Sequence, residues 1–412
     1  MNITSQQWQL VRLKEVCDLQ NGYAFKSSDY VEHSNTLNCR MSNIRPNGVF
    51  DLDHNPTYLP DSYVDQHKNY ILNDGDVIIA MTDMATKAKI LGVPTVVYTK
   101  GKNLLLNQRV GKLVIKNPNS LYFPYLQYAL NRDRVKKYYL KFAGGGLQIN
   151  LGKDDLLSVK IPLPPLEEQK RIAAILDKAD AIRRKRKEAI ALTEELLRST
   201  FLDMFGDPVT NPKEWEKVKL NAIVKKIDSG WSPKCDSREA NSSEWGMLKL
   251  GAVTWGHFNS SENKALLSGT EPRPELEVKK GDLLFSRKNT YELVGATAYV
   301  HSTRAKLLIP DLIFRLCLSE KVDPVYLWQA LSRKTMRNEL SRLASGSSGS
   351  MPNISKARLK NLLVPLPPLN LQIKYKEAVN KFLSCKESQQ KTALHTNNLF
   401  NSLLQKAFRG EL

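Results

Sequence analysis

One sequence pattern occurs twice in this chain, and the duplication limits what the chain can fold into more than any other feature. The segment Ile161-Pro-Leu-Pro-Pro-Leu-Glu-Glu-Gln169 returns as Val364-Pro-Leu-Pro-Pro-Leu-Asn-Leu-Gln372. The segment Trp8-x-x-Val11-x-Leu13 returns as Trp215-x-x-Val218-x-Leu220, and Gly75-Asp76 returns as Gly281-Asp282. Self-similarity of this kind marks a repeated structural unit. We therefore predict two similar halves, which would suit a target that is itself in two parts.

Length and composition agree with two domains. The 412 residues exceed the usual size of one hydrophobic core. A hydrophobic content of 42% with 25% charged residues is typical of globular domains. We predict mixed α/β domains at 1–165 and 208–368 and long helices at 166–207 and 369–412, an α+β fold that is used twice.

Short β-rich runs bounded by turn residues predict the strands of both domains. In the first half these runs are 76–80, 93–98 and 110–115, and their counterparts in the second half are 282–286, 296–300 and 307–318. Apolar and aromatic residues at spacings of three and four predict short helices at 121–140 and 324–343.

The repeated proline-rich elbows are best explained as rigid joints. Proline fixes its own backbone angle and disfavours the helical conformation in the residue before it, so a helix must begin after each elbow. The sequence Pro-Leu-Pro-Pro also fits a polyproline ligand for the aromatic groove of a partner. Its recurrence at the same place in both halves favours the joint.

The segments after the elbows predict two long helices. Each has about 40 residues without proline or interior glycine, which gives a helix of about 60 Å at ~1.5 Å per residue. Apolar stripes mark both ends of each helix, and their middles are more polar. Lone helices would leave these stripes in water, so we predict that the two helices pack against each other.

A strong excess of positive charge indicates a polyanionic partner. Lys and Arg number 61 against 42 Asp and Glu, a formal net charge of +19. Nucleic acid is favoured over an anionic membrane surface, because no run approaches the roughly 20 apolar residues that span a bilayer and the N-terminal segment lacks the apolar core of a signal peptide. We expect a soluble, cytoplasmic protein with reduced cysteines, since its five cysteines have no paired spacing.

We find no motif of self-contained catalysis in the sequence. It has neither of the glycine-rich loops that bind nucleotide phosphates, and its six histidines lack the spacing of a metal site. Leucine precedes both Pro-Pro pairs, where an amino methyltransferase acting on DNA carries Asp or Asn. Glu277-Val-Lys279 with Asp282 resembles part of a nuclease motif, but a charged strand edge before a turn explains it better. We therefore expect no catalytic residue and no bound metal.

Glycine-rich loops and polar strand ends are the candidate binding features. The loops 142–150 and 345–355 occupy matching positions in the two halves, and such loops can bring backbone N–H groups close to a phosphate. A plain connector is the alternative. The segments 286–290 and 81–89 also match, and their Arg and Asn side chains are suited to reading base edges in the major groove. Solvated loop charges are the alternative there.

Two further basic segments are candidates for phosphate contacts. Arg183-Arg-Lys-Arg-Lys187 lies in the middle of the first long helix, where it would follow a phosphate backbone, contact an acidic partner or simply face solvent. The segment 132–141 holds one acidic residue, Asp133, among five Arg and Lys residues.

Taken together, these motifs resemble the specificity subunit of a type I restriction-modification system over essentially the whole chain. The resemblance rests on the paired W-x-x-V-x-L segments, the Ser229-Gly-Trp-Ser-Pro233 stretch, the Gly-Asp turns, the two elbows, and the long helices that end near Phe205-Gly206 and Phe408-Arg-Gly410. The first half departs from the pattern, because Asn21-Gly-Tyr-Ala-Phe25 stands where Ser-Gly-x-x-Pro is expected.

The resemblance implies two target-recognition domains, each reading one half of an interrupted double-stranded DNA site, held apart by an antiparallel coiled coil of the two long helices with pseudo-twofold symmetry. Two modification subunits would methylate adenine with S-adenosylmethionine, and restriction subunits would translocate and cut DNA with ATP and Mg²⁺. This chain itself would bind no cofactor. It would supply sequence choice alone.

The residue assignments follow from the loops and from this resemblance. The candidate DNA-binding residues are Thr82, Lys87, Lys89, Lys141, Gly144, Gly145, Gly146, Gln148, Asn150, Ser229, Trp231, Ser232, Arg287, Lys288, Asn289, Thr290, Ser347, Ser348, Ser350, Asn353 and Lys356. The candidate partner-binding residues on the long helices are Ile172, Ile182, Leu196, Phe201, Phe382, Leu399 and Leu403.

Three other interpretations remain open on the sequence. The chain would be an enzyme if it assembled a site without a recognisable motif. It would be a protein-interaction scaffold if its charge were incidental. It would also fit the specificity subunit of a related methylating nuclease complex.

Overall fold

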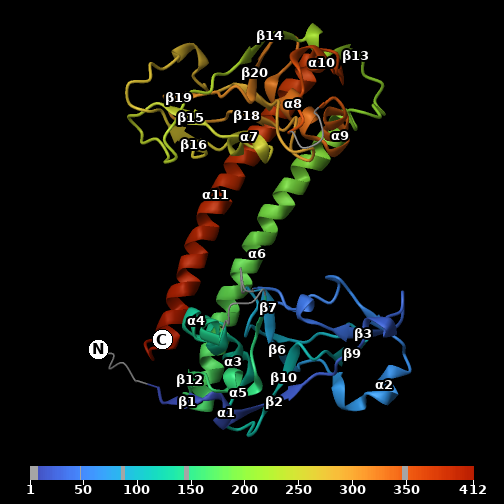
Figure 1. The fold of residues 1–412 in the computed structure, drawn as a ribbon, viewed down its shortest axis with the longest axis vertical. Helices are drawn as coiled ribbons and strands as arrows, with labels where there is room; N and C mark the ends of the chain where they lie inside the picture. The colour runs from blue at the N-terminus through green and yellow to red at the C-terminus, as the bar shows by residue number, and fades with distance from the viewer. Residues whose placement is uncertain (1–7, 47, 85–88, 143–147, 346–350) are drawn as a thin grey trace. The chain divides into compact units, whose positions relative to one another are not determined.

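The computed structural model describes residues 8–46, 48–84, 89–142, 148–345 and 351–412. The chain forms two compact units, residues 1–187 with 392–412 and residues 188–391. The long helices α6 (Leu166–Phe205) and α11 (Leu369–Ala407) each contribute one part to each unit. These two helices are the predicted ones. Figure 1 labels many of the elements in each unit.

The first unit contains two four-stranded sheets and several short helices (Figure 1). Its strands are β1 (Leu10–Arg12), β2 (Cys17–Asn21), β3 (Thr36–Cys39), β4 (Tyr58–Leu59), β5 (Ile71–Leu72), β6 (Val77–Ala80), β7 (Thr82–Met84), β8 (Pro94–Val96), β9 (Asn103–Leu106), β10 (Val110–Ile115), β11 (Gln148–Asn150) and β12 (Lys160–Pro162). Its short helices are α1 (Leu13–Val16), α2 (Tyr63–Gln66), α3 (Phe123–Leu130), α4 (Asp133–Tyr139) and α5 (Lys153–Leu157).

The second unit repeats much of this plan. Its strands are β13 (Lys217–Lys219), β14 (Val224–Ser229), β15 (Gly246–Leu248), β16 (Asn263–Ala265), β17 (Leu283–Ser286), β18 (Thr297–Tyr299), β19 (Leu307–Leu308), β20 (Ile313–Leu318) and β21 (Leu363–Pro365). Its short helices are α7 (Gly251–Thr254), α8 (Pro324–Ser332), α9 (Lys334–Arg342) and α10 (Lys356–Lys360).

Strand order confirms the duplication that the sequence predicts. The antiparallel sheet β2-β10-β6-β8 of the first unit corresponds to β14-β20-β17-β18 of the second. The parallel pair β3 and β9 corresponds to the parallel pair β15 and β19. Because strand order, direction and chain position agree, the two domains are copies of one α/β fold.

Three boundaries differ from the sequence prediction. The run 307–318 forms two strands, because Pro310, which has no N–H to donate to a ladder, falls between β19 and β20. The segment 121–140 forms α3 and α4, separated at Arg132, whose backbone is extended. The segment 324–343 divides in the same way at Arg333.

The elbow motif is a buried joint, and the side chain of its final glutamine stabilises it by hydrogen bonds. In the first unit the Gln169 side chain donates to the Pro164 carbonyl at 2.8 Å and accepts from the Tyr122 N–H at 2.9 Å. In the second unit Gln372 donates to Pro367 at 2.7 Å and accepts from the Asp323 N–H at 2.8 Å.

A tyrosine hydrogen bond to each elbow also occurs in both units. Tyr125 and Tyr326 donate to the carbonyls of Pro162 and Pro365, each at 2.7 Å. Both glutamines are fully buried. The elbow therefore serves as a joint, and its prolines and glutamine are engaged within the chain.

Each unit has a main hydrophobic core that includes parts of both long helices. In the first unit Leu176 of α6 and Phe400 of α11 belong to one cluster. In the second unit Phe201 contacts Tyr375, while Thr193 donates to Gln389 at 3.2 Å. Within this unit the partner residue number falls as the α6 number rises, so the two helices run antiparallel.

The tryptophan of each W-x-x-V-x-L segment bonds the last residue of a long helix. Trp215 Nε1 donates to the Phe205 carbonyl at 3.0 Å. Trp8 Nε1 donates to the Ala407 carbonyl at 3.1 Å, a contact across 399 positions of sequence. The two W-x-x-V-x-L segments therefore play the same part in the two units, β1 pairing with β12 and β13 with β21.

Candidate nucleic-acid interface

Several predicted DNA-binding residues of the second unit meet around the ring of Phe314. Arg287 follows β17, and its Nε donates to Asn353 Oδ1 at 3.0 Å although 66 positions separate them. The Arg287 carbonyl accepts from the Ile354 N–H at 2.8 Å, and Lys288 forms a bridge with Asn353. The guanidinium lies 5.2 Å from the Phe314 centroid. Strand β17 and the segment before α10 thus form one surface.

Two more segments complete this surface. Lys356, the first residue of α10, places its ammonium 5.5 Å from the Phe314 centroid and donates to the Ile227 carbonyl at 2.7 Å. Ser229 pairs with Phe314 in the β14–β20 ladder and is exposed. We call Ser229, Arg287, Asn353, Lys356 and Phe314 the Phe314 cluster.

The loop after β14 lies next to this cluster. The Trp231 ring lies under the Arg273 guanidinium at 4.6 Å, and the hydroxyl of Ser232 bonds the Asp311 carboxylate. Ser232 and Thr290 are exposed. Hydroxyl, amide and guanidinium groups of this kind suit contacts to base edges and phosphates.

Asn289 has a different role from the predicted one. Its side chain is buried, with 7% of its surface exposed, and donates to Thr254 Oγ1 at 3.3 Å. Its backbone N–H donates to the Pro352 carbonyl. The amide therefore holds the loop in place and is not free to read an adenine.

The first unit brings its candidates together at the matching place. Strand β7 pairs with β11, so that Thr82 lies opposite Asn150, and the Thr82 hydroxyl donates to Asn150 Oδ1 at 2.8 Å. Leu151 N–H donates to the Met81 carbonyl at 2.8 Å, as Ile354 donates to Arg287. Thr82 is buried at 4% exposure, which leaves Asn150 as the exposed member of the pair.

Three further candidates of the first unit are exposed, and seven predicted residues of the two units lie outside the described residues. Lys89, Lys141 and Gln148 are exposed, and the Lys141 ammonium lies 6.0 Å from the Tyr138 centroid. The predicted residues that lie outside the described residues are Lys87, Gly144, Gly145, Gly146, Ser347, Ser348 and Ser350.

Glycine and an aromatic residue mark a pair of equivalent positions, of which the predicted DNA-binding residues include only Trp231. A Cβ on Gly230 would lie 2.1 Å from the Ile309 carbonyl oxygen, and one on Gly22 would lie 2.2 Å from that of Asn107. The next residue donates in both units, Trp231 to Ile309 at 3.1 Å and Tyr23 to Leu106 at 2.9 Å. Tyr23 therefore occupies the place of Trp231.

Tyr23 has an aromatic setting of its own. It is 40% exposed and lies 5.0 Å from Phe25 and 4.4 Å from His67, measured between ring centroids. The shared Gly-aromatic step was the available signal in the sequence, and the missing proline in the first half obscured it.

The predicted partner-binding residues divide by burial. Ile182, Leu196 and Leu399 are exposed at 52%, 52% and 58%, which keeps them available to a partner. Ile172 and Phe201 are almost fully buried in the cores of their units, so they stabilise the fold and a partner cannot reach them. Phe382 and Leu403 are half-buried.

The residues of the apparent nuclease motif have structural partners. Glu277 Oε1 accepts from the Lys306 N–H at 2.6 Å, and its carbonyl accepts from Arg315 at 2.9 Å. Arg315 also lies 3.0 Å from Asp228 and 3.4 Å from Asp282. In the described part of the chain, no group of three or more His, Cys, Asp or Glu side chains is placed to hold a metal ion.

The ion pairs around Arg315 predict acid sensitivity of the second unit. Desolvation acts to raise the pKa of Asp228, but hydrogen bonds and charges from Lys226 and Arg315 outweigh it and lower the pKa below its ordinary value. Stability from a depressed carboxyl pKa is present above the unfolded value, near pH 4, and is lost as the pH falls through the folded pKa.

We therefore expect the urea midpoint of the wild type to drop between pH 5 and pH 3 more steeply than that of Asp228→Asn, which has no carboxyl to titrate. Parallel midpoint curves for the two proteins would contradict this assignment. The measurement is urea unfolding followed by fluorescence across this pH range.

Comparison with known proteins identifies the class to which this duplicated binding fold belongs. The family model described as the type I restriction modification DNA specificity domain matches residues 5–192 and 212–394. The chain belongs to this family.

Individual relatives agree. The chain is 26% identical to the type I restriction enzyme EcoKI specificity subunit of Escherichia coli strain K12, over 98% of this chain and 89% of that one. It is 34% identical to the type I restriction enzyme EcoEI specificity subunit of Escherichia coli, over 46% of this chain and 33% of that one.

Solved structures show the same fold. The S subunit of a type I restriction-modification system from M. genitalium superposes with a TM-score of 0.59 at 14% identity, covering 99% of this chain and 97% of that one. Among the residues described here, no helix combines the length and apolar character that crossing a membrane requires.

Proposed function

We propose that this chain is the subunit that selects the DNA sequence for a type I restriction-modification complex, with each domain reading one half of an interrupted duplex site. The observation that carries the proposal is the repeated arrangement of a polar strand end, the segment before α5 or α10 and a Gly-aromatic step. Two copies of one binding surface suit a target in two parts.

The chemistry proposed for each surface is direct reading of bases, supported by phosphate contacts. In the second domain the guanidinium of Arg287 would face guanine, because Arg can donate two hydrogen bonds to guanine O6 and N7. Lys356 would lie near the backbone. Asn150 would supply the amide in the first domain.

Partner subunits would supply the reactions. We propose that modification subunits carry S-adenosylmethionine and that restriction subunits carry ATP and Mg²⁺, while this chain binds no cofactor. The exposed apolar residues Ile182, Leu196 and Leu399 on the long helices would contact those subunits, because exposed apolar side chains are a feature of interaction sites.

A map of N6-methyladenine tests the proposal. DNA from cells that express this chain with its modification subunits is compared with DNA from cells that lack only this chain. A gapped, two-part motif that depends on the chain is the expected result. No chain-dependent methylation from an assembled complex would reject the proposal and favour a protein-interaction scaffold.

One substitution tests base reading in the second domain. Arg287→Ala should relax one position in one half of the methylated motif and weaken binding to the intact site by about 10- to 100-fold, since a base pair read by two hydrogen bonds contributes roughly 1–3 kcal/mol. Lys360→Ala, which removes an exposed cation at the end of α10, is the matched control. An unchanged motif with uniformly weaker methylation would show that Arg287 contacts phosphate.

A further inference from the structure

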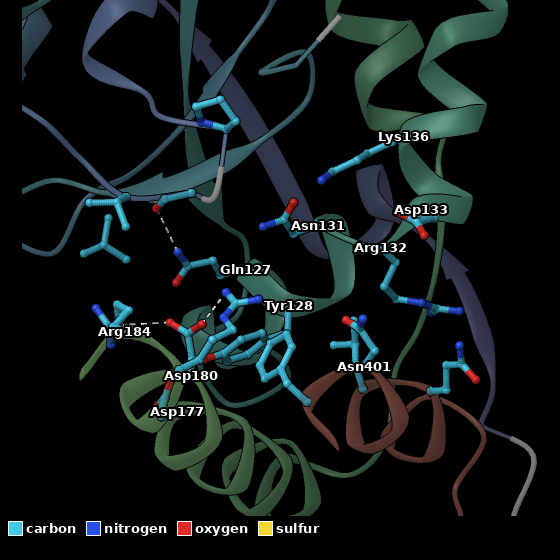
Figure 2. Close-up of a pocket in the computed structure, with 18 of the residues that line it drawn as sticks. Gln127, Tyr128, Asn131, Arg132, Asp133, Lys136, Asp177, Asp180, Arg184 and Asn401 are labelled. Carbon is cyan, nitrogen blue, oxygen red and sulfur yellow. Dashed lines mark hydrogen bonds and ion pairs between the residues drawn. The ribbon is translucent and has the colours of Figure 1, made fainter. Parts of the chain in front are cut away.

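The first unit contains a cleft of about 720 Å³ that is separate from the candidate base-reading surface. It lies between Pro46, Gly48, Val49 and Phe50, the junction of α3 and α4, the first half of α6 and the end of α11. Figure 2 shows Lys136, Asn131 and Arg132 on one side, with Asp177, Asp180 and Arg184 of α6 across from them. All these elements belong to one unit.

The cleft joins two basic segments that are separate in the sequence. From the segment 132–141 it takes Arg132, Arg134 and Lys136, and from the basic run on α6 it takes Arg183 and Arg184. Arg409, just after α11, also lines it. Cations from three separate stretches of chain therefore surround one opening.

Two of the carboxylates that line the cleft have partners inside the protein. Asp180 lies 2.5 Å from Arg183 and 3.1 Å from Arg184, and Asp177 accepts from the Tyr128 hydroxyl at 2.6 Å. The third, Asp133, is exposed at the first turn of α4. Six Arg and Lys residues line the cleft against these three carboxylates, so the lining carries a net positive charge.

Those cations lack acidic partners in the described part of the chain. No ion pair there involves Arg132, Arg134, Lys136 or Arg409. Lys136 is half-buried, whereas its neighbour Lys137 is exposed and does not line the cleft. A half-buried cation without a counter-charge has lost hydration that an anion would replace.

In the second unit the arginine that corresponds to Arg132 has hydrogen-bond acceptors within the protein. Arg132 lies 4.5 Å from the Phe408 centroid, and its counterpart Arg333 lies 4.9 Å from that of Phe201. Arg333 donates to the Gln329 carbonyl and to the Gln329 side chain. Tyr128 stands where Gln329 would be, and it donates to Asp177 instead.

The contrast singles out the first unit. Burial lowers the pKa of both guanidinium groups. Among the described residues, however, Arg333 has hydrogen-bond acceptors for its guanidinium, whereas the Arg132 guanidinium has only the Phe408 ring. An arginine left in this state at the wall of a polar cleft is a candidate ligand for a group with several acceptor oxygens.

We propose that this cleft binds phosphodiester groups of the DNA backbone, a sequence-independent contact that only the first unit makes. The inference rests on the proposed function. A phosphodiester fits because its anionic oxygens accept from the arginine fork and from lysine. The chain carries a formal net charge of +19, which favours an anionic partner.

The test is the salt dependence of DNA binding by the full-length chain assembled with its modification subunits. Wild type, Lys136→Gln, Arg409→Gln and the matched control Lys137→Gln are titrated with the methylated-motif duplex and with a random duplex between 50 and 300 mM salt. Each lost phosphate contact should lower the slope of log affinity against log salt by about 0.9.

We expect Lys136→Gln and Arg409→Gln to lower affinity about three- to tenfold on both duplexes, with the reduced slope, because phosphate contacts carry no sequence information. Lys137→Gln should match wild type. The methylated motif should stay the same in all variants, which separates this test from that of the proposed function.

Two outcomes would overturn the inference. The first is that Lys136→Gln and Arg409→Gln keep the wild-type slope while the motif is still methylated, which would remove the phosphate contact and leave sequence reading intact. The second is that they lose co-purification with the modification subunits at an unchanged slope, which would assign the cleft to an acidic protein surface. Thermal unfolding of each variant shows whether its fold is retained.

Discussion

Gly230→Ala should abolish reading of one half of the DNA site and leave the other half readable. A Cβ at this position would lie 2.1 Å from the Ile309 oxygen and 2.2 Å from the Pro310 oxygen. Both are backbone atoms, so no side-chain rotation relieves the contact and β14 must separate from the segment before β20. We expect the second unit to lose about 1–3 kcal/mol of stability or more, as overpacked sites do.

The measurements are the methylation motif and domain unfolding. Methylation at the two-part motif should fall to background, while binding to a duplex that holds only the half-site of the first domain should persist. Gly22→Ala should give the reverse pattern, because its Cβ would meet the Asn107 carbonyl oxygen at 2.2 Å.

Gly152→Ala is the matched control for these variants. The added Cβ would approach only the Asp155 carboxylate, at 3.2 Å, and a side chain can move away. We expect nearly normal methylation from this variant. Wild-type behaviour of Gly230→Ala would show that the Gly-aromatic step does not hold the reading surface.

Inserting seven residues in each long helix should lengthen the gap between the two half-sites by about three base pairs. Seven residues add about 10 Å at ~1.5 Å per residue, and each base pair spans about 3.4 Å. Insertion after Lys187 in α6 and after Lys391 in α11 leaves the contacts within each unit intact, because the units divide there. A seven-residue insert turns the helix by only ~20° from two full turns.

The methylation map reads the spacer directly, and a longer gap with unchanged half-sites is the expected result. An insert in α6 alone is the control. In the second unit Thr193 bonds Gln389, and Glu194 lies 2.7 Å from Lys386. An insert in one helix alone would shift the register of these contacts relative to the α6–α11 contacts of the first unit. That variant should lose methylation. An unchanged spacer in the double insertion would rule out the helices as the element that sets it.

Much of the fold was predictable because the repeat carries strong local signals. Proline chemistry marks the elbows, and the absence of proline and interior glycine marks α6 and α11, which begin and end close to the predicted positions. Short β-rich runs bounded by turn residues identify β6, β10 and β17. Helix boundaries inside α3–α4 and α8–α9 were not predicted, since an extended Arg132 or Arg333 has no distinct sequence signature.

The candidate site was predictable only in outline. Matching positions in the two halves pointed to the ends of β7 and β17, but hydrogen bonds between residues distant in sequence decide which side chains are free. Asn289 is held by Thr254, and Thr82 is buried. Tyr23 was not among the predicted residues, because the first half lacks the proline of the Ser-Gly-x-x-Pro pattern. The cleft around Lys136 was missed, because it depends on segments that only the fold brings together.

The hydrogen bonds of the two tryptophans show that the two copies of the sequence repeat do not coincide with the two compact units. Trp8 belongs to the first copy of the pattern and Ala407 to the second, yet they close the same unit. Each core is thus built from both copies, just as a domain-swapped dimer builds each lobe from two chains. A single copy would leave its helix without the matching partner, so we expect a chain of half this length to need a second molecule of itself to complete a core.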